Sequence, residues 1–242
     1  MRAVILAGGR GTRLLPYTSV LPKPLVPVGD LPILEIIIHQ LTEAGFSPIT
    51  LALGYLGELI RAFVANRKSL ASRGDILFVQ EEAPTGTAGA LKLVTGLSET
   101  FLVMNGDILT SLDYHCLRDF HQSSGAILTI ASFRKGLQID LGVLELDPSR
   151  TRVRGYNEKP QLTLPVSMGI YVFEPRALDY IPEDEYFDFP SLVLKLLAAG
   201  EEVAYHLDDD CIWLDLGRPE DFARAQDIFR DHGRELRLPG HA

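Results

Sequence analysis

The first fourteen residues constrain the fold most, because a short apolar segment leads directly into a glycine-rich basic loop. Residues 2–7 are too short for a helix and stop at glycine, so we expect a buried strand. Gly8, Gly9 and Gly11 let backbone N–H groups turn toward an anion, because no Cβ blocks its approach. Arg13 adds a guanidinium that matches phosphate oxygens. The segment therefore predicts a polyphosphate-binding loop at the end of the first strand.

Two common nucleotide-binding patterns do not fit this loop. The dinucleotide pattern G-x-G-x-x-G has Leu14 where its third glycine belongs. A P-loop requires Gly-Lys-Ser/Thr, whereas Gly11 is followed by Thr12 and Arg13. The loop is therefore either a phosphate site of another class or an ordinary turn between a strand and a helix.

Length, charge and cysteine content limit the class of protein. A chain of 242 residues can bury one substantial core. Its 23 Lys+Arg and 32 Asp+Glu give a net charge of −9, which argues against nucleic acid or an anionic membrane as a partner. Cys116 and Cys211 are too few for a disulfide framework or a zinc site and are typical of a reducing cytosol. No signal sequence or membrane span is evident, so we expect a cytoplasmic protein, and a homo-oligomer is compatible with these features.

Alternating strand and helix patterns predict an α/β fold with a Rossmann-like, mixed but mainly parallel sheet flanked by helices. The strands expected are 3–7, 49–53, 75–79, 101–104, 126–133, 142–146, 153–156, 166–173, 203–207 and 212–216. The helices expected are 32–44, 56–65, 87–94, 190–199 and 219–229. We expect one domain over 1–230, with a first half to about residue 110 and a strand-rich, substrate-binding half after it. Residues 231–242 are expected to form a polar, frayed tail.

Lys23 lies between Pro22 and Pro24. The prolines stiffen the segment and keep it out of a helix, so the lysine is presented in a fixed direction. The glycine loop nearby favours a phosphate-binding role over a solvated lysine in a turn.

A second small-residue loop follows the strand at 75–79. Gly86 and Gly89 would allow a flat ring to approach the backbone, and Glu81 could accept hydrogen bonds from the guanine N1–H and 2-amino group. Uracil and thymine offer one imide donor between two carbonyls, which would repel a carboxylate. The alternative is a plain turn in which Thr85 or Thr87 caps a helix.

Two aspartates end apolar strands, Asp107 in Asn-Gly-Asp and Asp215 before Leu216-Gly217. A carboxylate at the end of a buried strand is costly unless it is paired or bound to metal. Because Mg²⁺ is held by one or two carboxylates plus substrate phosphates, we predict an Mg²⁺ site here. Each aspartate could instead be a simple turn residue.

Glu158 and Lys159 end the strand at 153–156, before Pro160. A glutamate can accept bonds from sugar hydroxyls and a lysine can bind phosphate, whereas the alternative is a surface ion pair of little energetic value. The six histidines are scattered without the spacing of a triad or a metal site, and we assign them no role.

These segments together resemble the sugar-1-phosphate nucleotidyltransferases, also called nucleotide-sugar pyrophosphorylases. The resemblance runs from residue 1 to about 229. It implies that the half to about residue 110 binds the NTP and that the half from about 111 to 230 binds the sugar phosphate. The blocks that carry it are Leu6-Ala-Gly-Gly-Arg-Gly-Thr-Arg-Leu14, Pro22-Lys-Pro-Leu25, Asn105-Gly-Asp107, Glu158-Lys-Pro160 and Trp213-Leu-Asp-Leu-Gly217.

The resemblance implies that the phosphate of a sugar 1-phosphate attacks the α-phosphorus of an NTP, giving an NDP-sugar and pyrophosphate. It implies Arg13 and Lys23 as catalytic residues and Mg²⁺ held by Asp107 and Asp215. The nucleotide-binding residues implied are Leu6, Ala7, Gly8, Gly9, Gly11, Thr12, Arg13, Lys23, Glu81, Gly86 and Asp107. Those implied for the sugar phosphate are Gly142, Glu158, Lys159 and Gly169.

The segments 81–91 and 167–175 look most like mannose-1-phosphate guanylyltransferases and their heptose relatives. Met168 departs from the Asn-Ala that usually precedes the glycine in that group. Transfer of a thymidylyl or uridylyl group to glucose 1-phosphate is the alternative activity. A regulatory subunit that binds nucleotide sugars without catalysis is the alternative of another class.

Overall fold

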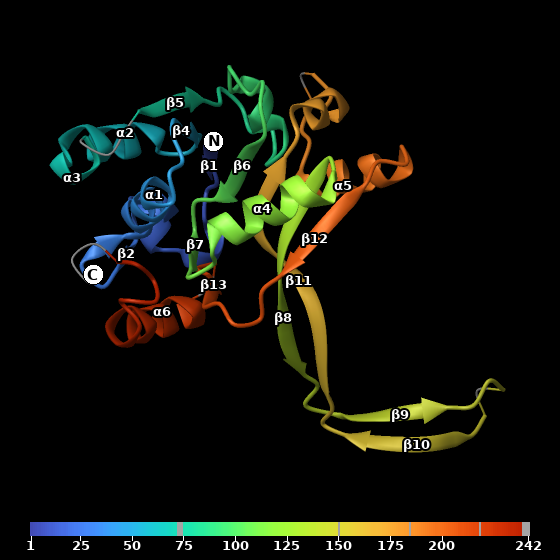
Figure 1. Cartoon of the computed structure of the whole chain (residues 1–242). Helices are drawn as coiled ribbons and strands as arrows, with labels where there is room; N and C mark the ends of the chain where they lie inside the picture. The colour runs from blue at the N-terminus through green and yellow to red at the C-terminus, as the bar shows by residue number, and fades with distance from the viewer. Residues whose placement is uncertain (72–74, 150, 184, 218, 239–242) are drawn as a thin grey trace.

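The computed structural model describes residues 1–71, 75–149, 151–183, 185–217 and 219–238. Its centre is a seven-stranded sheet in the order β12-β8-β11-β6-β1-β4-β5 (Figure 1). β11 runs antiparallel to both of its neighbours, and every other pair in this sheet is parallel. The strands are β1 (Arg2–Ala7), β4 (Ile49–Leu53), β5 (Ile76–Gln80), β6 (Phe101–Asn105), β8 (Leu128–Gln138), β11 (Gln161–Phe173) and β12 (Val203–Leu207). The predicted mixed, mainly parallel α/β fold is confirmed.

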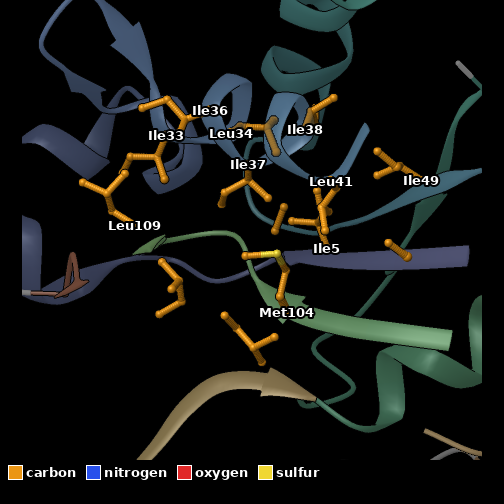
Figure 2. Packing of buried hydrophobic residues seen from close by; sticks show 14 of the residues in the cluster. Ile5, Ile33, Leu34, Ile36, Ile37, Ile38, Leu41, Ile49, Met104 and Leu109 are labelled. Carbon is orange, nitrogen blue, oxygen red and sulfur yellow. The ribbon is translucent and has the colours of Figure 1, made fainter. Parts of the chain in front are cut away.

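Both faces of β1 are buried, which explains its unbroken apolar sequence. Successive side chains point to opposite faces of the sheet, so Ile5 belongs to one apolar cluster and Val4 to another. The cluster around Ile5 is covered by α1 (Ile33–Glu43). Figure 2 shows Ile37 and Leu41 of this helix above Ile5 and Met104. The packing holds the carboxyl ends of β1, β4 and β6 side by side at one edge of the sheet.

The remaining elements cover the two faces or form small sheets of two strands each. The helices are α2 (Gly57–Asn66), α3 (Lys68–Ala71), α4 (Tyr114–Ser124), α5 (Phe189–Ala198) and α6 (Pro219–Asp231), and the 3-10 turns are η1 (Thr12–Leu14), η2 (Tyr17–Ser19), η3 (Lys23–Leu25), η4 (Gly89–Leu93) and η5 (Pro175–Tyr180). The paired strands are β2 (Pro27–Val28) with β3 (Leu31–Pro32), β7 (Ile108–Thr110) with β13 (Trp213–Asp215), and β9 (Gly142–Leu146) with β10 (Val153–Glu158). Within the described residues, no helix combines the length and the apolar character needed to cross a bilayer.

Two helical segments differ from the helices expected. The helix predicted over 87–94 is the shorter 3-10 turn η4. α4 was not predicted, because only Tyr114, Leu117 and His121 of its residues are buried and its apolar stripe is therefore thin. Its start does carry a signal, since the Asp113 side chain accepts bonds from two backbone N–H groups of the first turn.

The prediction of a frayed tail is wrong for residues 231–238. α6 continues to Asp231, and beyond it Leu236 and Leu238 are buried in the main core cluster. Gln40 Nε2 donates to the carbonyl oxygen of Leu236 at 2.6 Å, which fixes this segment against α1. Residues 239–242 of the expected tail lie outside the described residues.

Strands β8 and β11 are longer than predicted and leave the sheet as a two-stranded ribbon (Figure 1). β8 runs parallel to β12 and antiparallel to β11, so it leaves at the carboxyl end of the parallel strands. The ribbon leads into the hairpin of β9 and β10, which projects away from the rest of the molecule. We call residues 139–160 the arm.

Candidate active site

The glycine loop packs closely against the end of β4. Tyr55 N donates to the carbonyl oxygen of Gly8 at 3.1 Å. A Cβ built on Gly54 would lie 2.6 Å from that oxygen, so no side chain fits at position 54. The close approach leaves the next residues of the loop free to face outward from the sheet edge.

The loop then folds back toward Lys23. Gly11 has φ +61°, a left-handed conformation that favours glycine. Thr18 Oγ1 donates to the carbonyl oxygen of Gly11 at 2.8 Å, and a Cβ at Gly11 would lie 3.3 Å from Lys23 Cβ. The glycine loop and the proline-flanked lysine are therefore one connected structure.

Lys23 joins the two aspartates singled out in the sequence. Its ammonium donates a hydrogen bond to Asp107 Oδ2 and lies 3.7 Å from Asp215 Oδ1. Asp107 follows β6 and precedes β7, and Asp215 ends β13, which pairs antiparallel with β7. Leu216 N donates to the Asp107 carbonyl oxygen at 3.0 Å, so this small sheet holds both carboxylates next to one cation.

Arg13 reaches the same place. A Cβ built on Gly217 would lie 3.2 Å from Arg13 Cζ and 3.0 Å from Asp215 Oδ1. Glycine at 217 thus leaves room for the guanidinium beside the carboxylate. Two cationic and two anionic side chains meet at the mouth of the glycine loop.

The donor set fits a magnesium ion. Mg²⁺ prefers oxygen ligands and commonly takes only one or two protein carboxylates, leaving its other positions to water and phosphate. Asp107 and Asp215 supply two carboxylates that converge on one point. Within the described residues, no group of three or more His, Cys, Asp or Glu side chains could hold a metal, so a fully protein-made metal cage is not present there. The nearby Cys211 thiol stays protonated, since burial raises its pKa to about 12.

Glu81 stands at the other end of the loop. Its Oε2 accepts bonds from Thr85 N at 3.1 Å and from Thr85 Oγ1 at 2.8 Å. Its Oε1 lies close to Gly8, since a Cβ built on Gly8 would be only 2.4 Å from that oxygen. One carboxylate oxygen is thus fixed by Thr85 and the other borders the cleft.

The loop after Glu81 is docked on a segment a hundred residues later in the chain. Ala88 N and Gly89 N both donate to the carbonyl oxygen of Phe187, at 3.1 and 2.9 Å, and Phe187 N donates to the Thr85 carbonyl oxygen at 2.8 Å. Gly86 has φ +84°, and a Cβ there would lie 2.4 Å from the Phe187 oxygen. Gly86 therefore permits this contact.

These parts enclose one cleft of about 610 Å³. Its volume suits a small-molecule ligand. The lining runs from the glycine loop and Lys23, past Asn105 to Asp107, and along residues 81–90. Among the described residues, Tyr186 is the one that lines the cleft beyond Asp107. The residues predicted for nucleotide binding that line it are Leu6, Ala7, Gly8, Gly9, Gly11, Thr12, Arg13, Lys23, Glu81, Gly86 and Asp107.

The residues predicted for the sugar phosphate are not gathered there. Gly169 (φ +75°) lies behind the cleft, where a Cβ would be 2.6 Å from Asn105 Nδ2. Gly142, Glu158 and Lys159 lie on the arm and do not line the cleft. Their role toward a sugar phosphate stays a prediction.

Sequence reasoning missed several lining residues. Gly54 and Tyr55 follow β4, so the same rule that located residues 8–13 and 105–107 at strand ends would have found them. Arg10 lies 6.0 Å from the ring of Tyr55, which supports the outer side of the glycine loop. Tyr186 had no signal, because only the docking of residues 85–89 on Phe187 brings it to the cleft.

Comparison with known proteins identifies the family. The family model described as nucleotidyl transferase matches residues 2–232. The mannose-1-phosphate guanylyltransferase of Mycobacterium tuberculosis is 35% identical over 99% of this chain and 67% of its own length. The UTP–glucose-1-phosphate uridylyltransferase of Synechocystis is 28% identical over 99% of this chain and 66% of its own. A crystal structure of HddC from Yersinia pseudotuberculosis, complexed with GMP-PN, has 28% identity and a TM-score of 0.69, and the match covers 94% of this chain and 99% of that one.

The chain belongs to the nucleotidyl transferase family. Relatives matched over nearly its full length include mannose-1-phosphate guanylyltransferases and a glucose-1-phosphate uridylyltransferase. The resemblance seen in the sequence is therefore confirmed at the level of the family. The chain spans about two thirds of the length of these curated relatives.

Proposed function

We propose that this protein is a sugar-1-phosphate guanylyltransferase, which condenses GTP with a hexose or heptose 1-phosphate to form a GDP-sugar and pyrophosphate. The observation that carries the proposal is the convergence of Arg13, Lys23, Asp107 and Asp215 at the mouth of the glycine loop. Two cations beside a glycine-rich loop that lines the cleft suit a triphosphate.

The reaction needs positioning more than proton transfer. A phosphate oxygen of the sugar 1-phosphate forms a bond to the α-phosphorus of GTP, and the bond from that phosphorus to the oxygen bridging to the β-phosphate breaks. The nucleophile is already ionised, so no general base is required. The residues' task is to hold the two phosphates in line and to stabilise charge that grows on the departing pyrophosphate. Arg13 and Lys23 would supply that stabilisation.

We infer that Asp107 and Asp215 hold Mg²⁺, which when bound neutralises phosphate charge. Lys23 compensates the two carboxylates in the free protein. Asp107→Asn should lower turnover by at least a hundredfold while leaving the fold intact, because removing one preorganised charge at a reacting phosphate costs several kcal/mol. Asp119→Asn, the same change on the exposed side of α4, is the matched control. Near-wild-type turnover of Asp107→Asn would remove the metal assignment.

Guanine is favoured over uracil and thymine by the single free oxygen of Glu81. Thr85 occupies Oε2, so Oε1 is the acceptor available to a base. The guanine edge with N1–H and the 2-amino group presents two donors to such an acceptor. The family resemblance and the guanylyltransferase relatives point the same way.

Both cysteines are free thiols, in keeping with our inference of a cytoplasmic enzyme.

The test is a pyrophosphate-release screen of GTP, ATP, UTP, CTP and dTTP against mannose, glucose and heptose 1-phosphates. We expect release only when an NTP and a sugar 1-phosphate are both present, and fastest with GTP. Faster release with UTP or dTTP and glucose 1-phosphate would replace the guanylyl assignment with the uridylyl or thymidylyl alternative. Binding of a GDP-sugar with no release from any pair would support the regulatory alternative and refute the enzyme.

A further inference from the structure

Gly9 and Arg10 form the crest of the glycine loop. Gly8, whose carbonyl oxygen accepts a bond from Tyr55 N at 3.1 Å, precedes them, and Gly11 follows with its left-handed φ of +61°. A Cβ built on Gly9 would meet no atom within 4 Å, so the crest borders open space. Gly9 and Arg10 are exposed and line the cleft. The Arg10 side chain therefore starts from a held backbone at the edge of the cleft.

Tyr55 holds the Arg10 side chain above its ring. The guanidinium carbon lies 6.0 Å from the ring centroid, at the outer limit of a cation–π contact. The ring itself is fixed at both ends, because Tyr55 N donates to the Gly8 carbonyl oxygen and Tyr55 Oη donates to the Ser19 carbonyl oxygen at 3.3 Å. A contact at this distance is weak, whereas an arginine bound to phosphate makes strong charge-assisted hydrogen bonds. A phosphate can therefore take Arg10 from the ring.

The charge of Arg10 is available to a ligand. Lys23 bonds Asp107, and the Arg13 guanidinium lies beside Asp215. In the part of the chain that the structure describes, Arg10 forms no ion pair, although the chain carries 32 Asp+Glu. A guanidinium that lines a cleft, rests on an aromatic ring and shares its charge with no described carboxylate suits an anionic ligand.

We propose that Arg10 binds the β- and γ-phosphates of the NTP, the part that leaves as pyrophosphate. The assignment rests on the proposed function. With the base at Glu81 and the α-phosphorus beside Asp107, the rest of the triphosphate extends along the glycine loop, which lines the cleft together with these two residues. Arg10 turns from the ring to the phosphate oxygens, to which its guanidinium can donate two parallel bonds.

The contact contributes to turnover as well as to binding. Negative charge grows on the β-phosphate as the bond to the α-phosphorus breaks, so a cation at this place stabilises the transition state more than the bound substrate. Tyr55 is then a positioning residue, which keeps the Arg10 guanidinium at the cleft while no nucleotide is bound.

Binding of GTP, GMP and inorganic pyrophosphate to the full chain tests the contact without catalysis. In calorimetry at one Mg²⁺ concentration, Arg10→Met should raise the dissociation constants of GTP and pyrophosphate at least about tenfold and leave that of GMP within about threefold, because only the first two carry the phosphates that Arg10 binds. Arg61→Met is the matched control, since Arg61 lies 4.9 Å from the ring of Phe78, away from the residues that line the cleft, and it should change none of the three constants. Equal weakening of GTP and GMP by Arg10→Met, or no weakening of either, would overturn the proposal.

Two variants of Tyr55 test its positioning role. Tyr55→Leu removes the ring and should weaken GTP binding severalfold, whereas Tyr55→Phe keeps the ring and should retain more of the affinity. Because the ring acts through the guanidinium, the double variant of Arg10→Met and Tyr55→Leu should bind GTP about as well as Arg10→Met alone. Additive losses in the double variant would refute the positioning role.

The outcomes for Arg10 and for the proposed function can be told apart. Unchanged GTP binding by Arg10→Met, in a chain that releases pyrophosphate, would refute the Arg10 contact and leave the transferase standing. GTP binding that depends on Arg10, in a chain that releases no pyrophosphate with any sugar 1-phosphate, would do the reverse.

Discussion

Replacing Lys23 by methionine should affect metal binding and turnover in opposite directions. The lysine ammonium bonds Asp107 and lies 3.7 Å from Asp215. At this distance two unit charges interact by about 1 kcal/mol at the dielectric constant of water and by about 4 kcal/mol at an effective value of 20. Because the Asp215 side chain is 41% exposed, solvent screening keeps the interaction near the lower figure, at about 1–2 kcal/mol.

That interaction must be weakened when Mg²⁺ binds the two carboxylates. In Lys23→Met the competing cation is gone, so the affinity of the free protein for Mg²⁺ should rise by roughly five- to thirtyfold, the equivalent of about 1–2 kcal/mol. Turnover should fall by about 10²–10³, since a preorganised positive charge at the triphosphate is lost.

Titration calorimetry with Mg²⁺ measures the first effect, and pyrophosphate release measures the second. Lys23→Arg is the matched control, because it keeps the charge and should leave the Mg²⁺ affinity within a few-fold of wild type. If Lys23→Met binds Mg²⁺ no better than wild type while its circular dichroism is unchanged, Asp107 and Asp215 are not the magnesium ligands.

Three other changes follow from the geometry. Gly86→Ala should raise the KM for GTP at least tenfold, and it should lower stability by more than Gly125→Ala does. Both glycines have positive φ, but only at position 86 would the added Cβ press against the Phe187 oxygen. Equal effects of the two changes in KM measurements and in urea unfolding would refute this reasoning. Glu81→Gln should lower the ratio of GTP to UTP turnover about tenfold, since Thr85 would hold the amide oxygen and turn the NH₂ group toward the base. An unchanged ratio in the pyrophosphate-release assay would refute the role of Glu81 in selecting guanine. Burial lowers the pKa of His121, whose ring is hydrogen-bonded to Thr129 and Glu174. As the pH falls below 6.5, the ordinary pKa of histidine, the unfolded state therefore takes up a proton before the folded state does. The stability of the protein should then drop from pH 7.5 to pH 5.5. Thermal unfolding of His121→Asn should show a flatter dependence over that range, and an equal slope would contradict it.

The sequence predicted best those elements whose two faces are both buried. β1, β4 and β6 are continuous apolar runs stopped by glycine or a polar residue, so their bounds and the functional loops after them could be located. α4 was not found because it buries only three side chains.

The parts of the site that the sequence could not predict depend on contacts between distant segments. Tyr186 reaches the cleft only because Phe187 pairs with the loop at 85–89. The direction of the arm is set at a corner of side-chain and backbone bonds around Lys159, which no periodic pattern encodes. Its placement away from the cleft could therefore not be read from the resemblance of Glu158-Lys159-Pro160 to a sugar-phosphate block.

The backbone pairing between residues 85–89 and Phe187 has a consequence for exchanging parts between relatives. The wall of the cleft that we propose faces the base is made of two segments from opposite halves of the chain, joined by three main-chain hydrogen bonds. A chimera that transplants residues 81–90 alone would receive a loop shaped for a different partner segment, and its base preference would be lost rather than transferred. Base selectivity should move between family members only when the segment around 185–189 is transplanted together with it.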